Sequence, residues 1–589
     1  MKNIKIFSNI KYIYRCINEI DNGMFWSYIY CVPLDFLTVL LDMCIPSIFI
    51  YLLQNRSYTL FTICFVVASI GIIKIVLGYF ENYVYSKQYI AEHKLVMFFL
   101  EKLNVKLMSI NYERLEDPNF KLICEKAESS VANNHTEFIH FAENFTKGIC
   151  SILKFLAFCI ILTRLAWWII VVLLVSAGVQ YLLLLYIDDY EYKTKDSRIR
   201  VLRKLAYISY LSNEYKSAKD IRLYSLSGWL KEYFNDLNFE YHHVYKKLTR
   251  RKIITAFVDL LIIVLRDGGA YLYLGYLVLR GNISPAAFVL YFSVVSEFVG
   301  VLEEIVTSFE KMARGNYQAN DYLDLIKIDD RRKGETILNV QEAKKIEMKN
   351  VYFRFPNSEE YTLKNINIEI KAGEKIAIVG LNGAGKSTLI KLMCGMYNPT
   401  SGKVLIDGME ADHVERKNYF SCFSTVFQEI SVFPYSIAEN IIYKTKDMKL
   451  LEKCCKEAGI YSKITSLQQQ YDTKLIRNVC DDAIDLSGGE MQKLALARAL
   501  YKGAGIILLD EPSASLDPIA EKKLYEKYNS FSENKTSVFI SHRLASTRFC
   551  DRILLLENGS IVEEGSHQEL MKREGKYAQL FLVQSQYYR

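Results

Sequence analysis

The chain has 589 residues, more than one hydrophobic core usually organises, so we expect two domains. Hydrophobic residues make up 51% and charged residues 24% of the sequence, which indicates an apolar part and a soluble part joined in one chain. The net charge of +7 suits a membrane surface better than nucleic acid, because lysines and arginines gather beside apolar segments. For the same reason, no nucleic acid partner is expected. The 13 cysteines lack the spacing of zinc ligands or of a disulfide framework, so we interpret them as reduced thiols.

Residues 1–25 mix basic side chains with apolar ones at helical spacing. This pattern predicts an amphipathic helix that lies at the cytoplasmic surface of a membrane. A cleavable signal peptide is not expected, because no short apolar core is followed by a small-residue cleavage site. No domain precedes the first long apolar segment, so we expect no attached leader peptidase.

Six apolar segments follow, each close to the roughly 20 residues that a helix needs to cross a bilayer. We place them at 28–53, 59–82, 143–163, 165–187, 253–279 and 285–307. The connections on one side are short, while those on the other are long and rich in lysine and arginine. By the positive-inside tendency the long connections are cytoplasmic. The sequence therefore predicts a multi-pass protein of the cytoplasmic membrane with both termini in the cytoplasm.

Charged residues inside the apolar segments recur at a spacing of seven, which places both members of a pair on one helix face. The pairs are Asp35 with Asp42, Lys147 with Lys154, Asp259 with Arg266, and Glu297 with Glu304. Because a charge that faces lipid is costly, these faces should turn toward other helices or a wet cavity. They are either structural ion pairs or cavity-lining groups. If they line a cavity, their acidic excess favours a cationic or peptide cargo.

The long cytoplasmic connections have helical periodicity and contain two predicted turning points, at residues 111–118 and 207–213. Pro118 disfavours a helical conformation at Asp117, which fits a bend between two long helices. Residues 326–343 are polar and charged and are typical of a linker. We therefore predict a helical membrane domain over 1–325 and a second domain over 344–589, in which strand and helix signals alternate as in an α/β fold.

A phosphate-binding loop is predicted at Gly380-Leu381-Asn382-Gly383-Ala384-Gly385-Lys386-Ser387-Thr388. The apolar run 375–379 precedes it, and apolar residues at helical spacing follow it. Glycines allow backbone N–H groups to surround a triphosphate, while Lys386 would reach the β- and γ-phosphates and Ser387 would bind Mg²⁺. A glycine-rich turn without this function is the alternative, and the strand and helix on either side argue against it.

A second apolar strand, 505–509, ends in Asp510 and Glu511. Beside a phosphate loop, Asp510 is predicted to hold Mg²⁺ and Glu511 to orient or deprotonate the attacking water. Between the two motifs, Leu486-Ser487-Gly488-Gly489-Glu490 opens a helix and offers a second anion-binding geometry. This element is either an ordinary serine N-cap or a site for the nucleotide of another copy of the domain.

The order of these motifs, with Gln428, the stretch Ser513–Asp517 and His542, resembles the nucleotide-binding domain of ABC transporters. With six spans before it, the chain resembles an exporter-type half-transporter: an α-helical six-span transmembrane domain followed by an α/β P-loop NTPase domain. The resemblance implies that Phe355 stacks on adenine, where the family more often has tyrosine. It also implies that 112–118 and 207–213 are coupling helices.

The resemblance further implies a site residue by residue. Catalytic roles fall to Glu511, His542, Gln428 and Lys386, and Mg²⁺ is held by Ser387, Gln428 and Asp510. ATP is bound in cis by Phe355, Gly380, Asn382, Gly383, Ala384, Gly385, Lys386, Ser387 and Thr388, and in trans by Ser487, Gly488, Gly489, Glu490 and Asp517 of a second copy. The family's signature usually ends in glutamine, so Glu490 is a departure that brings a negative charge near the nucleotide.

The predicted function is ATP-driven export of a peptide, a lipid or a small amphipathic or cationic molecule by a dimer of half-transporters, identical or sister chains. The cofactors are ATP and Mg²⁺, and the bilayer is a second partner. One alternative is a membrane-anchored ATP-dependent regulator that moves no cargo. Another is an importer built on the same fold.

Overall fold

The computed structural model describes residues 6–54, 58–133, 135–165, 167–328, 334–356, 358–442, 447–511, 528–529, 531–541 and 544–586. The chain forms two compact units, each with its own contacts. The first comprises Met1–Val105 and Cys124–Lys327, and the second comprises Lys106–Ile123 and Ile328–Arg589. The domain boundaries expected from the sequence stay predictions.

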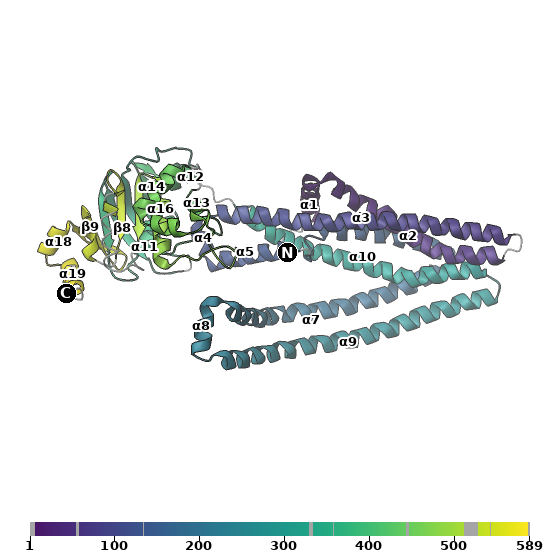
Figure 1. Ribbon diagram of the computed structural model, residues 1–589. Coiled ribbons are helices and arrows are strands. Elements are labelled where there is room, and N and C mark those ends of the chain that lie inside the picture. Colours follow the sequence, from purple (N-terminus) through teal and green to yellow (C-terminus); the bar gives the residue numbers. More distant parts are fainter. Residues whose placement is uncertain are drawn as a thin grey trace. The chain divides into compact units, whose positions relative to one another are not determined.

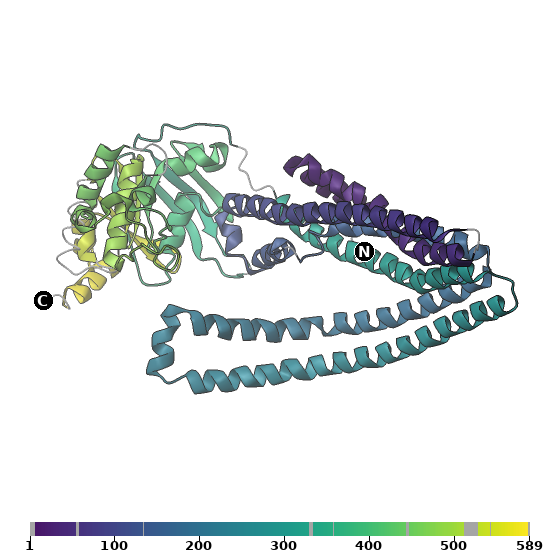
Figure 2. The same cartoon turned by 45° about the vertical axis from the view of Figure 1, so that its right-hand side comes forward.

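The first unit consists of helices. They are α1 (Ile6–Ile20), α2 (Asn22–Gln54), α3 (Leu60–Ser109), α5 (Pro118–Val131), α6 (Phe141–Thr163), α7 (Trp167–Asn213), α8 (Tyr215–Leu223), α9 (Ser227–Leu279) and α10 (Pro285–Ile326). The last residues of α3 and the first residues of α5 are counted in the second unit. Figure 1 and Figure 2 show the long helices of this unit running in roughly the same direction, with α7 and α9 joined by α8 into a hairpin.

Each of the six predicted spans falls on one long helix, although 59–82 and 165–187 begin one and two residues before α3 and α7. In the described part of the chain, α2, α3, α6 and α10 are long and apolar enough to cross a membrane. Helix α7 contains a shorter apolar segment, Trp167–Leu183. Helix α9 carries Asp259, Arg266 and Asp267, so its span over 253–279 stays a prediction. A helix satisfies its backbone hydrogen bonds internally, which is why long apolar segments adopt it in a bilayer.

The core of this unit lies between α6 and α10, with α2 and α7 beside them. Phe158, Leu162 and Phe298 are fully buried there. Helix α10 begins where the Ser284 hydroxyl accepts a hydrogen bond from the Ala287 N–H at 3.2 Å, and Pro285 fixes the first helical turn. The rest of this apolar helix then packs along α6.

Most of the charges inside the spans form ion pairs. Lys154 Nζ, on a side chain that is only 6% exposed, lies 2.9 Å from Asp35 Oδ2 and 3.8 Å from Glu304 Oε2. Asp42 pairs with Lys74, and Lys147 with Glu143. Arg266 contacts Asp267 through Nε and Nη2 at 2.7 and 3.1 Å. Asp259 is different: it accepts a hydrogen bond from the Gln180 amide and borders a cavity.

The amphipathic character of α1 is explained by packing within the unit. Ile13, Cys16 and Ile17 are buried against neighbouring helices. The polar side of α1 is hydrogen-bonded to α10, because Asn9 Nδ2 donates to Asn316 Oδ1 at 2.8 Å and to Asn320 Oδ1 at 3.0 Å. The apolar face of α1 is therefore covered by protein, where the sequence predicted a membrane surface.

The first predicted turning point is confirmed, and the chain turns directly after the second predicted stretch instead of within it. Helix α3 ends at Ser109, and the short helix α4 (Tyr112–Leu115) follows before α5 begins at Pro118. Residues 207–213 are instead the last two turns of α7, because this stretch contains no glycine or proline to end the helix. The chain turns at Glu214, and α8 is the short helix of this elbow.

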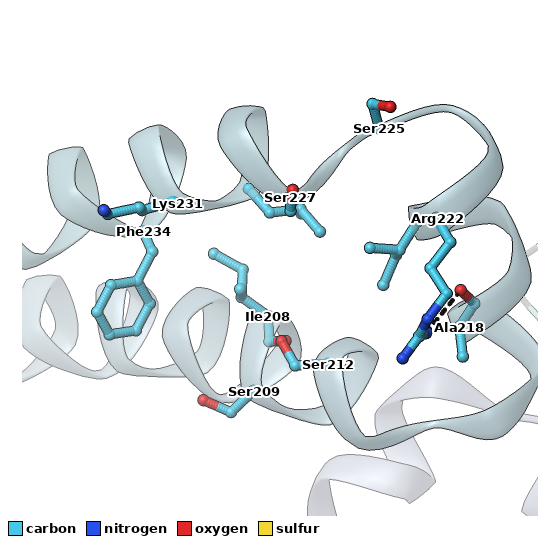
Figure 3. A pocket seen from close by; sticks show the side chains of 11 residues that line it. Ile208, Ser209, Ser212, Ala218, Arg222, Ser225, Ser227, Lys231 and Phe234 are labelled. Carbon is cyan, nitrogen blue, oxygen red and sulfur yellow. Dashed lines mark hydrogen bonds between the residues drawn. The ribbon is translucent and has the colours of Figure 1, made fainter.

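Figure 3 shows a cavity of about 750 Å³ at the elbow of α7, α8 and α9. Its lining includes Ser209, Ser212 and Lys231, with Ile208 and Phe234 as apolar neighbours. The Arg222 guanidinium is held by a 2.9 Å hydrogen bond to the Ala218 carbonyl. The Arg222 side chain therefore bonds to the backbone of its own helix, α8.

The second unit contains two sheets. The antiparallel one has the order β2 (Leu363–Ile370), β1 (Ile346–Phe353), β4 (Ser401–Ile406), β5 (Met409–Glu410). The larger one has the order β10 (Ser560–Gly565), β9 (Arg552–Glu557), β3 (Lys375–Val379), β8 (Thr536–Ile540), β7 (Ile506–Asp510), β6 (Phe423–Val426), and only the β9–β10 pair is antiparallel. The helices are α4, α11 (Lys386–Met393), α12 (Arg416–Ser421), α13 (Ile437–Ile441), α14 (Met448–Ala458), α15 (Tyr461–Ser466), α16 (Gly488–Lys502), α18 (His567–Lys572) and α19 (Lys576–Gln586).

Strand β3 lies in the middle of the larger sheet and is buried on both faces. Ile376 and Ile378 belong to the core on one face, whereas Ala377 and Val379 belong to the core on the other. This alternation explains the continuous apolar run of 376–379, which is typical of a parallel strand covered on both sides. The phosphate-binding loop therefore starts from a central strand that is buried on both faces.

Candidate nucleotide-binding site

The loop between β3 and α11 has a backbone that requires glycine. Gly380 has φ +156°, and a Cβ on it would collide with the Leu556 carbonyl. Gly385, the N-cap of α11, has φ +100°, and a Cβ there would lie 2.8 Å from Leu363 Cδ2. Both positions pack too tightly for a side chain and have dihedral angles that L-residues rarely adopt. The loop is thereby held open at the N-terminus of α11, where backbone N–H groups favour an anion.

Lys386 is the first residue of α11, and its side chain folds back over the loop. Its Nζ donates to the Gly380 carbonyl at 3.1 Å and to the Leu381 carbonyl at 3.0 Å. Burial lowers the pKa of Lys386, because the charged ammonium loses contact with water. An anion beside this ammonium would favour its charged form and offset the cost of burial. The lysine is thus placed to bind phosphate.

A cavity of about 790 Å³ gathers most of the residues predicted to act in cis. Its lining consists of Phe355, Thr362, Asn382, Gly383, Gly385, Lys386, Ser387, Thr388, Gln428 and Glu511. Gly380 also lines a neighbouring cavity with Asn382, whereas the Ala384 side chain is buried in the core. The volume is in the range of small-molecule sites. Sequence positions from 355 to 511 therefore meet around one nucleotide-sized space.

Asp510 lies beside this cavity at the end of β7 and is only 4% exposed. Burial raises the pKa of its carboxyl, and a hydrogen bond from Ser387 partly opposes the shift. Its Oδ1 is buried without a hydrogen-bond partner among the described residues. An orphaned carboxylate oxygen next to a serine hydroxyl suits a hard cation with oxygen ligands, and Gln428 adds an amide oxygen from the same cavity. These residues fit Mg²⁺.

Glu511 follows directly and adopts a left-handed backbone conformation with φ +49°. Its N–H donates to the Ile540 carbonyl at 3.1 Å, so the neighbouring strand β8 holds this conformation. A non-glycine residue in this region carries a backbone cost of about 1–2 kcal/mol. Such strain is commonly found where a side chain must be aimed at a reacting group. Here the side chain is directed into the nucleotide cavity.

Phe355 is half-buried at the rim of the cavity and stands edge-on to two aromatic rings. Its ring centroid lies 5.2 Å from that of Phe353 and 5.8 Å from that of Tyr397. Phe353 and Tyr397 are themselves stacked at 5.0 Å with an interplanar angle of 9°. These contacts fix the orientation of Phe355, as stacking on a planar base requires.

Tyr397 also connects this ring cluster to α4, within the second unit. Its hydroxyl donates to Glu116, and Lys391 Nζ donates to the Tyr397 hydroxyl at 3.0 Å. Lys391 lies 3.2 Å from Glu116 Oε1, and Glu113 accepts from the Asn398 N–H at 3.2 Å. Burial opposes ionisation of Glu116, yet the hydrogen bonds from Tyr397 and Lys391 hold its pKa below the usual value.

The sequence-based prediction missed Lys391 and Tyr397. The available signal was the position of Lys391 five residues after Lys386 on the same predicted helix. Two carboxylates, Glu113 and Glu116, also stand in the predicted turn before Pro118. The sequence pattern alone gave no reason to expect a contact between the helix that carries Lys391 and the turn that carries Glu113 and Glu116.

The signature stretch forms a helix N-cap and does not line the cis cavity. The Ser487 N–H and hydroxyl donate to Glu490 Oε2 at 2.8 and 2.9 Å, and the Glu490 N–H lies 3.4 Å from the Ser487 hydroxyl, forming a capping box that opens α16. Glu490 Oε1 pairs with Lys463 Nζ at 3.0 Å. The unusual acid is therefore both a capping group and half of an ion pair. Gly488 and Gly489 form the first turn of the helix. Asp517 and His542 lie outside the described residues.

Comparison with known proteins gives a consistent result. Residues 363–514 match the model of the family described as ABC transporter. The nisin transport ATP-binding protein of Lactococcus lactis subsp. lactis is 28% identical over 581 residues, covering 94% of this chain and 93% of that protein. The subtilin transport ATP-binding protein of Bacillus subtilis is 29% identical over 486 residues, covering 80% and 78%. Residues 363–514 therefore carry an ABC transporter domain, and most of the chain is similar to ABC transporters.

The fold of the chain is that of an ABC exporter. A bacterial Atm1-family ABC exporter with ATP bound superposes with a TM-score of 0.79 at 20% identity, covering 96% of this chain and 99% of that one. An ATP-dependent lipid A-core flippase of Pseudoalteromonas translucida (strain TAC 125) is 34% identical over 308 residues, covering 51% of this chain and 52% of that protein. The chain therefore combines an exporter fold with apolar helices long enough to cross a membrane and with an ABC domain that implies ATP binding and hydrolysis.

Proposed function

We propose that this chain is one half of a dimeric ATP-driven exporter in the cytoplasmic membrane, with both termini and the nucleotide-binding domain in the cytoplasm. One observation carries the proposal. The cavity beside the phosphate-binding loop, the stretch 486–490 that lies outside this cavity, and the short helix α4 all belong to one unit of the chain. The relatives named for nisin, subtilin and lipid A-core support a transport role. A peptide, a lipid or a small amphipathic cation is the proposed cargo class.

In this proposal ATP occupies the cavity beside the phosphate-binding loop. Phe355 stacks on the base, the loop N–H groups and Lys386 hold the phosphates, and Ser387, Asp510 and Gln428 hold Mg²⁺, which screens phosphate charge. Glu511 accepts the proton of the attacking water, assisted by His542. Ser487, Gly488, Gly489, Glu490 and Asp517 of the partner chain close the site from the other side, so ATP binding favours the closed dimer.

The partner is a second ABC half-transporter, either an identical chain or a sister chain. Purification of this chain alone, followed by measurement of its mass and ATPase activity, distinguishes the two. A dimeric mass with ATP turnover supports the homodimer. A monomeric mass without turnover supports a sister chain.

Transport direction tests the proposal. Inside-out vesicles that contain the transporter should take up cargo when ATP is added, and the Glu511→Gln variant should not. ATP-driven accumulation in right-side-out vesicles alone would support an importer and overturn the proposal. ATPase activity that no cargo stimulates, with no uptake in either orientation, would support a membrane-anchored regulator.

A further inference from the structure

A cavity of about 620 Å³ lies between α7, α9 and α10 of the first unit. Its walls are mostly apolar, with Leu174, Tyr181 and Leu302 among them. The lining residues come from the ends of three predicted spans: 174–187 of α7, 252–259 of α9 and 302–307 of α10. By the orientation expected from the positive-inside tendency, all three ends face the cytoplasm. The cavity is therefore within reach of a molecule that enters from the cytoplasm or from the inner leaflet.

Two carboxylates line this apolar space, and neither has a basic partner. Asp259 accepts a 2.6 Å hydrogen bond from the Gln180 amide, and Glu303 projects from α10. Within the part of the chain that the structure describes, no lysine or arginine forms an ion pair with either carboxylate. This distinguishes them from Asp35 and Glu304, which share Lys154. Uncompensated acids beside bilayer-spanning helices are costly unless a cation meets them.

The amide that holds Asp259 is also incompletely bonded. Gln180 is 9% exposed, and its Oε1 is buried without a hydrogen-bond partner among the described residues. Buried polar atoms in folded proteins are nearly always bonded, so an orphaned acceptor indicates a missing partner. The Gln180 oxygen adds a partial negative charge to the same wall as Asp259. A positively charged ligand satisfies both groups.

The remaining charges near the cavity do not reverse its sign. Lys252 also lines it, and Lys252 stands seven residues before Asp259, roughly 10 Å along the axis of α9. Arg266 lies outside the lining and its charge acts on Glu303, but the residue is paired with Asp267 through Nε and Nη2. The cavity wall therefore has a net negative charge, because it holds two carboxylates, one lysine and the unbonded Gln180 oxygen. Asp259 lies at the end of the cavity that is distant from Lys252.

We propose that this cavity binds amphipathic monovalent cations, with an apolar body against α7 and α10 and the positive charge between Asp259 and Glu303. This inference rests on the proposed export function, because it names the class of cargo that the exporter takes. The volume is within the usual range for small-molecule sites. An anion of the same size and shape is excluded, because it would face the carboxylates.

Tetraphenylphosphonium and tetraphenylborate test this proposal, since they have nearly the same shape and opposite charge. Binding of each radiolabelled ion to the full-length transporter in nanodiscs is measured without ATP, with empty nanodiscs as the blank. The phosphonium should bind saturably and the borate should not. Equal saturable binding of the two ions, or none of the phosphonium, overturns the proposal.

Three variants locate the site. Asp259→Asn should weaken phosphonium binding about tenfold, because it removes one of two carboxylates. Lys252→Gln should strengthen it several-fold, a gain that misfolding does not produce. Glu297→Gln is the matched control, because Glu297 lies on α10, is exposed and does not line the cavity. Unchanged affinity in both charge variants, or a loss in Glu297→Gln as large as in Asp259→Asn, overturns the proposal.

Vesicle transport separates this inference from the proposed function. If the phosphonium binds as expected but ATP drives no uptake of any cargo into inside-out vesicles, the export function fails and the cation site stands. If ATP drives uptake of another cargo while phosphonium binding is absent, the cation site fails and export stands.

Discussion

Glu116, the residue that directly follows α4, and Lys391 on α11 form an ion pair, with 3.2 Å between Oε1 and Nζ. They stand 275 positions apart in the sequence. Lys391 lies on the helix that begins with Lys386, and Tyr397 connects the pair to the rings around Phe355. The segment between α3 and α5 is thus bonded to α11, which carries Lys386, and to Tyr397, which contacts Phe355. We therefore expect a movement of α11 or of Tyr397 to displace α4.

Replacing Glu116 by glutamine should uncouple transport from ATP hydrolysis. The charged hydrogen bonds from Lys391 and Tyr397 stabilise the contact by on the order of 1–3 kcal/mol. Their loss should lower cargo uptake about tenfold, while ATPase activity stays within about twofold, since each 1.4 kcal/mol corresponds to a factor of ten. Uptake and ATPase activity are measured on the same reconstituted preparation.

Glu125→Gln is the control for this variant, because Glu125 is exposed on α5. Tyr397→Phe should have a smaller effect, since its ring keeps the 5.0 Å stack on Phe353. A parallel loss of ATPase and transport in Glu116→Gln would show that the contact supports folding and not coupling.

Replacing Glu490 by glutamine should strengthen ATP-dependent closure. Glutamine also forms a capping box with Ser487, so α16 keeps its N-terminus. The change removes a negative charge from a helix end that is predicted to meet phosphate, an effect on the order of 1 kcal/mol. The ATPase KM for ATP should fall about fivefold. Lys463→Gln should raise KM, because it leaves the Glu490 charge uncompensated. Equal KM values in all three proteins would contradict the predicted role of this helix end.

Glu490 also gives a pH dependence with a defined sign. Burial opposes its ionisation, but the Ser487 N–H and Lys463 hold its pKa below the usual 4.5. The carboxylate therefore stabilises the folded state above that pH, and this contribution is lost as the pH falls through the lowered value. Thermal unfolding of the full-length protein in detergent should depend less on pH below about 4.5 in Glu490→Gln than in the wild type.

The sequence indicated which residues gather around the cavity better than it indicated their distant contacts. Glycines, Lys386, Asp510 and Glu511 stand in local patterns that follow from strand-loop-helix geometry, and the structure gathers them around one cavity. The partners of Lys154 and Lys391 are distant in sequence, so no periodicity reveals them. The end of α7 was misplaced because residues 207–213 continue a good helical sequence. Its boundary is set by packing of the hairpin rather than by a breaker residue.

Replacing Lys154 by methionine should destabilise the membrane domain strongly. Lys154 is the buried partner of Asp35 and Glu304, and removing one partner of a buried ion pair costs about 3–5 kcal/mol. The midpoint of thermal unfolding in detergent should fall by about 10 °C. Lys147→Met is the matched control on the same helix, because Lys147 is 49% exposed and its pair with Glu143 should contribute less than about 1 kcal/mol. Similar shifts for the two variants would contradict a buried pair. The double variant Asp35→Asn with Lys154→Met should recover part of the loss.

Replacing Glu511 by glutamine should stop turnover without preventing ATP binding. Glutamine has the same size and the same backbone preferences, so the strained conformation at φ +49° is kept and only the base is lost. Removal of a general base lowers the rate by about 10²–10⁴. The variant should retain ATP and remain a closed dimer, which size-exclusion chromatography with bound-nucleotide analysis detects. Lys386→Ala separates the two functions, because it should lose ATP binding and closure together. ATPase activity at the wild-type level in Glu511→Gln would refute the role assigned to this carboxylate.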